Sequence, residues 1–264
     1  MTDAAETTRN RHGSFIWYEL LATDADAAAS FYGEVIGWTA APAGVPGIDY
    51  RLFSAAGVDV AGHMNIPAEG AEMGMRPGWY GFIGVDDVDA AVAAIEAEGG
   101  AVLMPAMDIE GVGRMAFVTD PQHVPFYVMR GASDEASHSF AARNGHCVWN
   151  ELSSADPARA LAFYTARFGW EEGGSMPMGA QGDYVFLNHG GEMIGAVMAG
   201  AGDGALPMWR FYFQVPDIDA AVAKVTRAGG TVRDGPHEIP GGEYMIVASD
   251  PQGAVFGAVG PRTA

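Results

Sequence analysis

Two glutamates stand at the same place in a segment that occurs twice in the chain. Glu19 lies in the sequence WYEL and Glu151 in WNEL, so each follows a tryptophan, Trp17 or Trp149, by two residues. In a strand, residues two apart point to the same side. A carboxylate beside an indole can accept an N–H group of a ligand, act as a general base with a raised pKa, or hold a cation against the ring.

The segments around the two glutamates are duplicated. Gly13–Trp38 matches Gly145–Trp170 with ten of 26 positions identical, and Trp79–Val102 matches Trp209–Val232 with eleven of 24 identical. Identity at this level at nearly the same offset, 132 residues for the first pair and 130 for the second, indicates an internal repeat. The chain of 264 residues therefore contains two homologous halves.

The repeat sets the expected domains. We predict one domain over residues 13–131 and a second over 145–260, joined by a linker at 132–144. Residues 1–12 are polar and are expected to be disordered, and residues 261–264 form a short tail.

Each domain divides again into two modules of the order strand, helix, three strands. In the first module, Phe15–Leu21 alternates as a strand does, Thr23 or Asp24 can cap a helix that runs to about Val35, and Gly37 ends it. In the second module a helical stripe begins at Val88 and ends at Gly99–Gly100. Further strands are expected at Tyr50–Ser54, Val58–Met64, Tyr80–Val85, near Val102, Arg114–Thr119 and Val124–Met129. The fold class is α+β, built of four βαβββ modules, and no glycine fingerprint of a dinucleotide-binding fold separates a strand from a helix.

Charge and cysteine content exclude several function classes. Fourteen basic residues against 33 acidic ones give a net charge of −19, which disfavours nucleic acid and anionic lipid as partners. Cys147 is the single cysteine, so neither an intrachain disulfide nor a thiolate zinc site can form. No apolar run is long enough to span a bilayer and no secretory signal is apparent, so we expect a cytoplasmic protein.

The combined pattern W-x-E-L, then FY and GW, then V-x-D-[VI]-D-A-A-V and finally D-P-Q, present twice, resembles the vicinal oxygen chelate superfamily. That superfamily includes glyoxalase I, bleomycin-binding proteins and extradiol dioxygenases. The resemblance implies curved, mostly antiparallel sheets, with helices on the convex side and a ligand cleft on the concave side. In the catalytic members, His, Gln or Glu on the first and last strand of each module hold a divalent metal.

Carried over to this chain, the metal positions hold unsuitable residues. In the first domain they fall on Trp17, near Gly62 and within one residue of His63, on Tyr80 and on Tyr127. In the second domain they fall on Trp149, about Gly195, Arg210 and Gly257. An indole has no lone pair to give and a guanidinium is already positive, so we predict no metal cofactor. The alternative is a Zn, Ni, Mn or Fe site, which requires three of His63, Glu19, Glu151, Asp59, Glu192 or a loop histidine to converge.

Strand alternation then predicts what each cleft contains. The first cleft is expected to hold Trp17, Glu19, Tyr80, Phe82 and Tyr127, with Phe15 and Leu21 on the same face of their strand. The second is expected to hold Cys147, Trp149, Glu151, Arg210, Tyr212 and Gln214, with an ion pair between Glu151 and Arg210. His63 is the best histidine candidate for a site, the alternative being a packed residue. Pro125 is expected to distort the last strand of the first domain and with it the place of Tyr127.

The presence of the glutamate in both repeats, whose other cleft residues differ, favours W-x-E-L as a packing element. This interpretation predicts a contact from Glu19 to the hydroxyl of Tyr80 or Tyr127. Under the ligand interpretation Glu19 is instead the candidate catalytic carboxylate. The fourteen methionines, some in the loop Pro67–Gly78, would give a cleft or its lid an adaptable surface.

Three functions remain open. The leading hypothesis is a metal-free protein that binds a small aromatic or cationic molecule, either to sequester it or to transform it. The others are a metal-dependent lyase or dioxygenase-like enzyme, and a degenerate scaffold whose clefts are filled by their own side chains. Four modules in one chain favour a monomer over a homodimer, although the modules could pair within or between domains.

Overall fold

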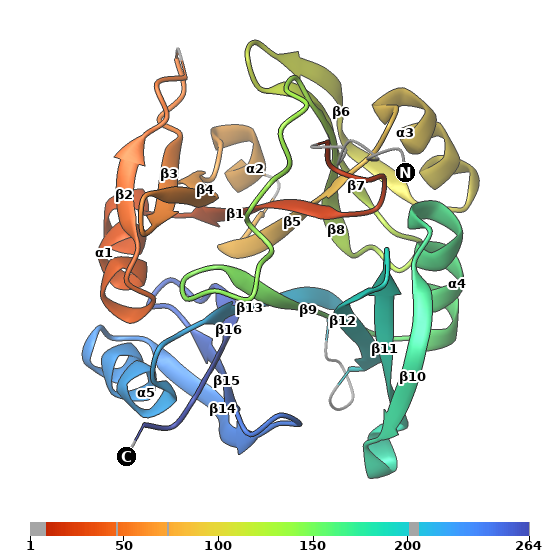
Figure 1. Cartoon of the computed structure of the whole chain (residues 1–264). Coiled ribbons are helices and arrows are strands. Elements are labelled where there is room, and N and C mark those ends of the chain that lie inside the picture. Colours follow the sequence, from red (N-terminus) through yellow and green to blue (C-terminus); the bar gives the residue numbers. More distant parts are fainter. Residues whose placement is uncertain (1–8, 46, 73, 201–205, 264) are drawn as a thin grey trace, which may run out of the picture.

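A computed structural model describes residues 9–45, 47–72, 74–200 and 206–263 of the chain. It consists of two eight-stranded, mixed sheets of identical topology, one from each half of the sequence (Figure 1). Each sheet is completed by the two modules of its own half, so the modules pair within the domain and are not exchanged.

The first sheet has the strand order β2-β3-β4-β1-β5-β8-β7-β6. Strand β1 runs parallel to β4, β5 runs parallel to β8, and β1 pairs antiparallel with β5 at the junction of the two modules. The strands are β1 Phe15–Ala22, β2 Thr39–Pro42, β3 Arg51–Ala55, β4 Val58–Asn65, β5 Gly78–Gly84, β6 Ala101–Ile109, β7 Gly113–Thr119 and β8 Pro125–Gly131.

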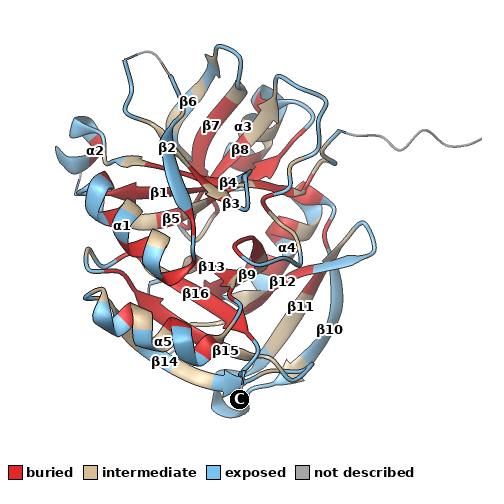
Figure 2. Cartoon of the chain, turned by 60° about the vertical axis from the view of Figure 1, so that its left-hand side comes forward, coloured by how far each residue is buried: buried red, intermediate tan, exposed pale blue. Residues whose placement is uncertain are grey.

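The second sheet repeats this order as β10-β11-β12-β9-β13-β16-β15-β14. Its strands are β9 Cys147–Ser154, β10 Glu171–Pro177, β11 Asp183–His189, β12 Glu192–Ala199, β13 Met208–Gln214, β14 Thr231–Glu238, β15 Tyr244–Ser249 and β16 Val255–Gly260. The edge strands of both sheets are largely exposed, whereas the central strands are buried (Figure 2).

Four helices follow the first strand of each module: α1 (Ala25–Val35), α3 (Val88–Ala97), α4 (Pro157–Phe168) and α5 (Ile218–Arg227). Each begins after an aspartate whose side chain accepts the backbone N–H three residues on, which caps the helix. A short helix α2 (Ala68–Glu72) follows β4, and a 3₁₀ turn η1 (Gly179–Gln181) precedes β11. No helix in the described ranges has the length and apolar character needed to cross a membrane.

The helix-bearing faces of the two sheets turn toward each other and share one hydrophobic core. Helix α1 packs beside α5, and α3 beside α4 (Figure 1). Aromatic rings meet across the two halves in this core, as in the contacts of Phe15 with Trp209 and of Trp38 with Phe213. The concave faces therefore point outward, at opposite ends of the molecule.

Buried hydrogen bonds join the halves in pseudo-symmetric pairs. The indole of Trp79 donates to the Tyr32 hydroxyl at 2.9 Å, and this hydroxyl donates to Asp250 of the second half at 3.3 Å. In the equivalent set, the Trp209 indole donates to the Tyr164 hydroxyl, and this hydroxyl donates to Asp120 of the first half. Burial raises the pKa of Asp120 and Asp250. The repeated FY and D-P-Q motifs thus act mainly at this interface.

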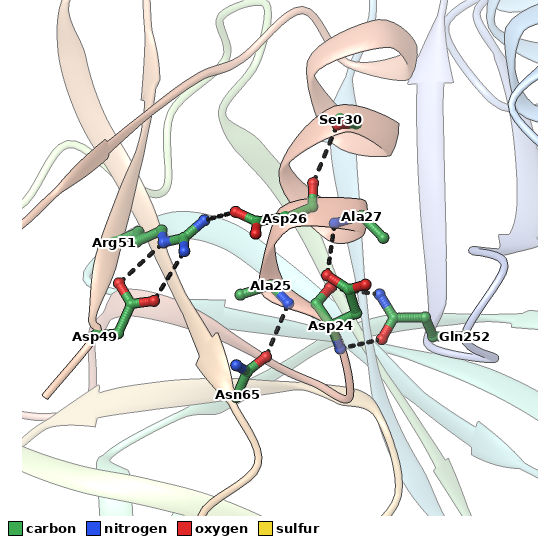
Figure 3. A network of polar contacts seen from close by, with 9 residues as sticks. All are labelled: Asp24, Ala25, Asp26, Ala27, Ser30, Asp49, Arg51, Asn65 and Gln252. Atoms are coloured by element: carbon green, nitrogen blue, oxygen red, sulfur yellow. Dashed lines mark hydrogen bonds and ion pairs between the residues drawn. The ribbon is translucent and has the colours of Figure 1, made fainter.

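The glutamine of D-P-Q holds the helix start of the opposite half. The Gln252 side-chain oxygen accepts the N–H of Thr23 at 2.8 Å. It also accepts the N–H of Asp24 at 2.7 Å, and the Gln252 amide donates back to the Asp24 carbonyl (Figure 3). On the same helix start, Arg51 joins Asp26 to Asp49. In the other half, Gln122 accepts from Ser154 and from the N–H of Asp156.

Two local departures from simple alternation change the expected facing of side chains. The β1–β5 ladder shifts register between Phe15 and Trp17, so Phe15 enters the shared core while Ile16 joins the opposite face. The equivalent shift in the second half places Cys147 in the core and Val148 beside Trp149. The prediction that Phe15 and Cys147 face the clefts was wrong, because each first strand carries an extra residue there.

The expected distortion by Pro125 does not occur. Pro125 is the first residue of β8, where a missing N–H costs nothing to the ladder, and β8 pairs regularly with β7 from there to Gly131. His123 takes the positive φ of 66° that Gly253 takes, at 96°, in the second half.

The expected disordered segment 1–12 falls partly outside the described residues, which begin at residue 9. The described part lies on the folded chain, with Arg9 on Asp86 and His12 on the Arg167 carbonyl. Of the expected tail 261–264, residue 264 lies outside the described residues.

Candidate ligand clefts

The first cleft, the concave face of the first sheet, is a cluster of aromatic rings and methionines. The register brings Trp17 and Glu19 of β1 opposite Phe82 and Tyr80 of β5, and Phe82 beside Tyr127 of β8. Phe82 and Tyr127 are stacked at 4.1 Å between ring centroids. Around them pack Ile16, Met75, Met104, Ile109, Met115, Phe117 and Met129. Five predicted residues thus lie together.

Glu19 lies on the same face and accepts hydrogen bonds from tyrosines. Its side chain accepts a hydrogen bond from the Tyr127 hydroxyl at 3.0 Å, which confirms the predicted contact. Tyr50, just before β3, also bonds Glu19 and accepts the Trp17 indole N–H at 3.0 Å. Gly62 of β4 makes room for this hydroxyl, since a Cβ there would overlap it.

The Glu19 carboxyl has no oppositely charged partner among the described residues. Among the described residues, no cationic side chain forms an ion pair with Glu19, and only 5% of the residue is exposed. Burial raises its pKa from 4.5 to about 7, against the lowering effect of the hydrogen bonds from Tyr127 and Tyr50. A carboxyl of this kind changes its charge near neutral pH and can act as donor or acceptor.

The second cleft keeps the same three residues but adds a cation. The Trp149 indole donates to the Tyr184 hydroxyl at 2.7 Å, and this hydroxyl donates to Glu151 at 2.9 Å. Arg210 binds the same carboxylate at 2.6 Å, which confirms the predicted ion pair. Tyr212 donates to it at 3.2 Å, and its ring lies over Gly257, where a Cβ would overlap the ring.

His63 lies elsewhere. Gly62, not His63, is the β4 neighbour of Glu19, so His63 points to the helix-bearing face, where its ring stacks on Phe53 at 4.0 Å. It is 0% exposed and neither ring nitrogen has a hydrogen-bond partner within the described part of the chain. Burial lowers its pKa to about 4. The structure therefore does not bring His63 into the first cleft.

The donor set does not fit a divalent metal. The positions that carry metal ligands in the catalytic members hold an indole, a glycine and two phenols in the first cleft. Burial raises the pKa of Tyr127 and Tyr50 well above the usual value, which disfavours phenolate ligands. Glu19 is a single carboxylate, and Glu151 is occupied by Arg210. No group of three His, Cys, Asp or Glu in the described residues could hold a metal ion.

Two cavities of the described chain lie away from the first cleft, and the second of them borders Val148, which packs beside Trp149 of the second cleft. One of about 280 Å³ lies between α3 and α4 and includes His12, Asp86, Ala94 and Phe168. The other, of about 410 Å³, is bordered by Phe140, Ala142, Val148, Glu192 and Met193. Neither borders Trp17 or Glu19.

The sequence matches one family model twice, over residues 14–128 and 143–257: the glyoxalase/bleomycin resistance protein/dioxygenase superfamily. The chain belongs to this family. It is 38% identical over 253 residues to "Putative glyoxylase CFP32" of Mycobacterium tuberculosis, covering 95% of this chain and 96% of that protein. It is 31% identical over 263 residues to the anthracycline biosynthesis protein DnrV of Streptomyces peucetius, covering 96% and 94%.

Solved structures share the fold at low identity. The Mn(II)-bound glyoxalase of Novosphingobium aromaticivorans superposes with a TM-score of 0.63 at 19% identity, over 97% of this chain and 83% of that one. An extradiol ring-cleaving dioxygenase from B. fuscum gives 0.66 at 14% identity, over 99% and 75%. At these identities the likenesses concern the fold alone.

The sequence reasoning missed Tyr50 and Tyr184. Each accepts the indole N–H of its cleft's tryptophan and bonds the glutamate of that cleft. A signal was present, because both halves carry Asp-Tyr at the start of the third strand, at Asp49-Tyr50 and Asp183-Tyr184.

Proposed function

We propose that this protein binds an aromatic small molecule in the first cleft without a metal ion. The observation that carries the proposal is the residue set at the family's metal positions, where Trp17, Gly62, Tyr80 and Tyr127 stand among aromatic rings and methionines. Ring faces favour stacking with a planar ligand, and methionine side chains adapt to its shape. Trp17, Tyr80 and three methionines of this surface are only half-buried, so a ligand can reach them.

The relatives accord with this ligand class. One carries a name from anthracycline biosynthesis, and anthracyclines contain fused aromatic rings. We also propose that the protein acts in the cytoplasm and as a monomer, and the completion of each sheet by modules of the same chain supports the monomer.

The test combines metal analysis with ligand titration. Tag-free protein is analysed by mass spectrometry for Zn, Ni, Mn and Fe, and is then titrated calorimetrically with 1-naphthylmethanol in the presence of EDTA. We expect binding without bound metal. About one metal ion per chain, with binding lost on chelation, would instead support the metal-dependent enzyme.

Matched variants locate the site. Trp17→Ala should weaken binding about fivefold or more, because a stacking face is worth on the order of 1 kcal/mol or more. Trp149→Ala, which removes the equivalent indole of the second cleft, should leave binding unchanged. The opposite pattern would move the proposed site to the second cleft.

A scaffold that acts through protein contacts is the second candidate. It is favoured by the buried rings of Phe82, Phe117 and Tyr127, which occupy the centre of the first cleft. Failure of 1-naphthylmethanol and related aromatic probes to bind would support this candidate.

A further inference from the structure

The second cleft contains a cation at a position where the first cleft has none. Within the β1–β5 pair Glu19 stands opposite Tyr80, and within the β9–β13 pair Glu151 stands opposite Arg210. Tyr80 and Arg210 are therefore equivalent by register. The two glutamates are also equivalent, since each is bonded to a tyrosine that accepts its cleft's indole N–H.

Tyr80 does not replace the charge that Arg210 supplies. Its ring packs edge-on against Phe117 at 5.3 Å and against Tyr127 at 6.4 Å. The only side chains hydrogen-bonded to Glu19 in the described chain are tyrosines. A buried carboxylate without a counter-ion is unfavourable, so a charge brought by a ligand has a strong partner there.

From this correspondence we infer that the first cleft takes an aromatic ligand carrying an ammonium or guanidinium group, and that this group lies against the Glu19 carboxylate. The second cleft shows the same carboxylate holding a guanidinium at 2.6 Å within the chain itself. The faces of Trp17 and Tyr80 add an attraction for a cation that neutral ligands lack. The net charge of −19 attracts cations to the molecule as a whole.

The inference rests on the proposed function, and a matched pair of probes separates the two. 1-Naphthylmethylamine, protonated at pH 8, is compared by calorimetry with 1-naphthylmethanol, which has the same ring and no charge. We expect the amine to bind at least about tenfold more tightly, because a hydrogen bond between charged groups adds more than that between neutral ones.

The Glu19→Gln variant tests whether the Glu19 carboxylate is the partner of the ligand's cationic group. It should bring the ratio of the affinities for 1-naphthylmethylamine and 1-naphthylmethanol close to one. Glu151→Gln, the equivalent change in the second cleft, should leave this ratio at its wild-type value. The amide is close in shape to the carboxyl, so folding of the variant is checked by circular dichroism and unfolding.

A second variant supplies the cation from the chain. Tyr80→Arg gives the first cleft the residue of the second, and its guanidinium should occupy the Glu19 carboxylate and weaken amine binding at least about tenfold.

Binding of neither probe would overturn the proposed function, and the inference with it. Equal binding of both probes to the wild-type protein would support the proposed function but overturn the inference that the ligand carries a cationic group. A tenfold preference that survives Glu19→Gln would also overturn the inference, since the charge would then lie elsewhere.

Discussion

In the first cleft Glu19 lies against tyrosine hydroxyls and a surface of aromatic rings, whereas in the second cleft Glu151 lies against the guanidinium of Arg210. Both clefts keep the indole, tyrosine and glutamate in the same contacts, with Trp17 matched by Trp149. The residues that differ are their neighbours on the adjoining strands.

The difference separates what supports the fold from what can be specialised. The tryptophan, tyrosine and glutamate that both clefts share join the first strand of each domain to the residues at its third strand. This explains why W-x-E-L occurs in both halves. Tyr80 and Tyr127 in one cleft correspond to Arg210 and Gly257 in the other. Such exchanges alter charge and shape on the concave face, whereas the indole, tyrosine and aspartate contacts that join the halves occur in both.

The largest effect that the comparison predicts is a pH dependence that arises from Glu19 in the first cleft. The pKa of Glu19 is about 7 in the folded chain and about 4.5 when unfolded, so the folded state holds its proton more tightly. The resulting stabilisation is complete below about pH 4.5 and is lost as the pH rises through about 7. Glu19→Gln removes this dependence.

The measurement is urea unfolding of wild-type and Glu19→Gln protein from pH 4 to pH 8. The free energy of unfolding of the wild type should fall relative to the variant by up to about 3 kcal/mol over this range. Taking the difference cancels other titrating groups, such as the buried Asp120 and Asp250. A difference that stays flat with pH would show that Glu19 keeps an ordinary carboxyl environment.

A smaller effect is predicted for the cation of the second cleft. Arg210→Met leaves the buried Glu151 without its ion-pair partner and should lower the free energy of unfolding by about 2 kcal/mol at pH 8, less than for a fully buried pair because the Arg210 side chain is 22% exposed. Tyr80→Met, the equivalent change in the first cleft, should cost less than half as much.

The double variant Arg210→Met/Glu151→Gln should recover most of the stability, since it removes the charge together with its partner. If Arg210→Met costs no more than Tyr80→Met, the ion pair does not distinguish the two clefts.

Most of the fold could be predicted from the sequence because the duplication shows every element twice. The helix begun by Asp24 and the strands from Phe15 and Val58 lie within a residue or two of their expected bounds. The prediction of which face of the sheet a side chain lies on was wrong for Phe15 and Cys147. A bulge adds one residue to each first strand, and simple alternation cannot reveal a bulge. The polar bonds of Gln252 across the halves also escaped prediction, since they depend on how the two sheets pack.

The candidate site was predictable to the extent that it depends on strand register. Trp17, Glu19 and Tyr80 needed only alternation and pairing. The placement of His63 in the cleft was wrong, because His63 lies one residue from the position that neighbours Glu19. A shift of one residue turns a side chain to the other face of the sheet. Tyr50 reaches the cleft over a glycine, a close approach that no periodicity shows.

The smallest effect concerns the tyrosines that both clefts share. Tyr50→Phe and Tyr184→Phe each remove a hydroxyl that bonds an indole and a glutamate, and each should lower the free energy of unfolding by about 1 kcal/mol at pH 5. At pH 8 the two should diverge. Glu19 is then ionised and has lost one of its two hydroxyl donors, whereas Glu151 keeps Arg210 and Tyr212. Tyr50→Phe should therefore cost more at pH 8 than at pH 5, and Tyr184→Phe about the same at both. Parallel urea titrations at the two pH values provide the comparison, and equal behaviour of the two variants would mean that the neighbouring guanidinium makes no difference to how each carboxyl depends on its tyrosine.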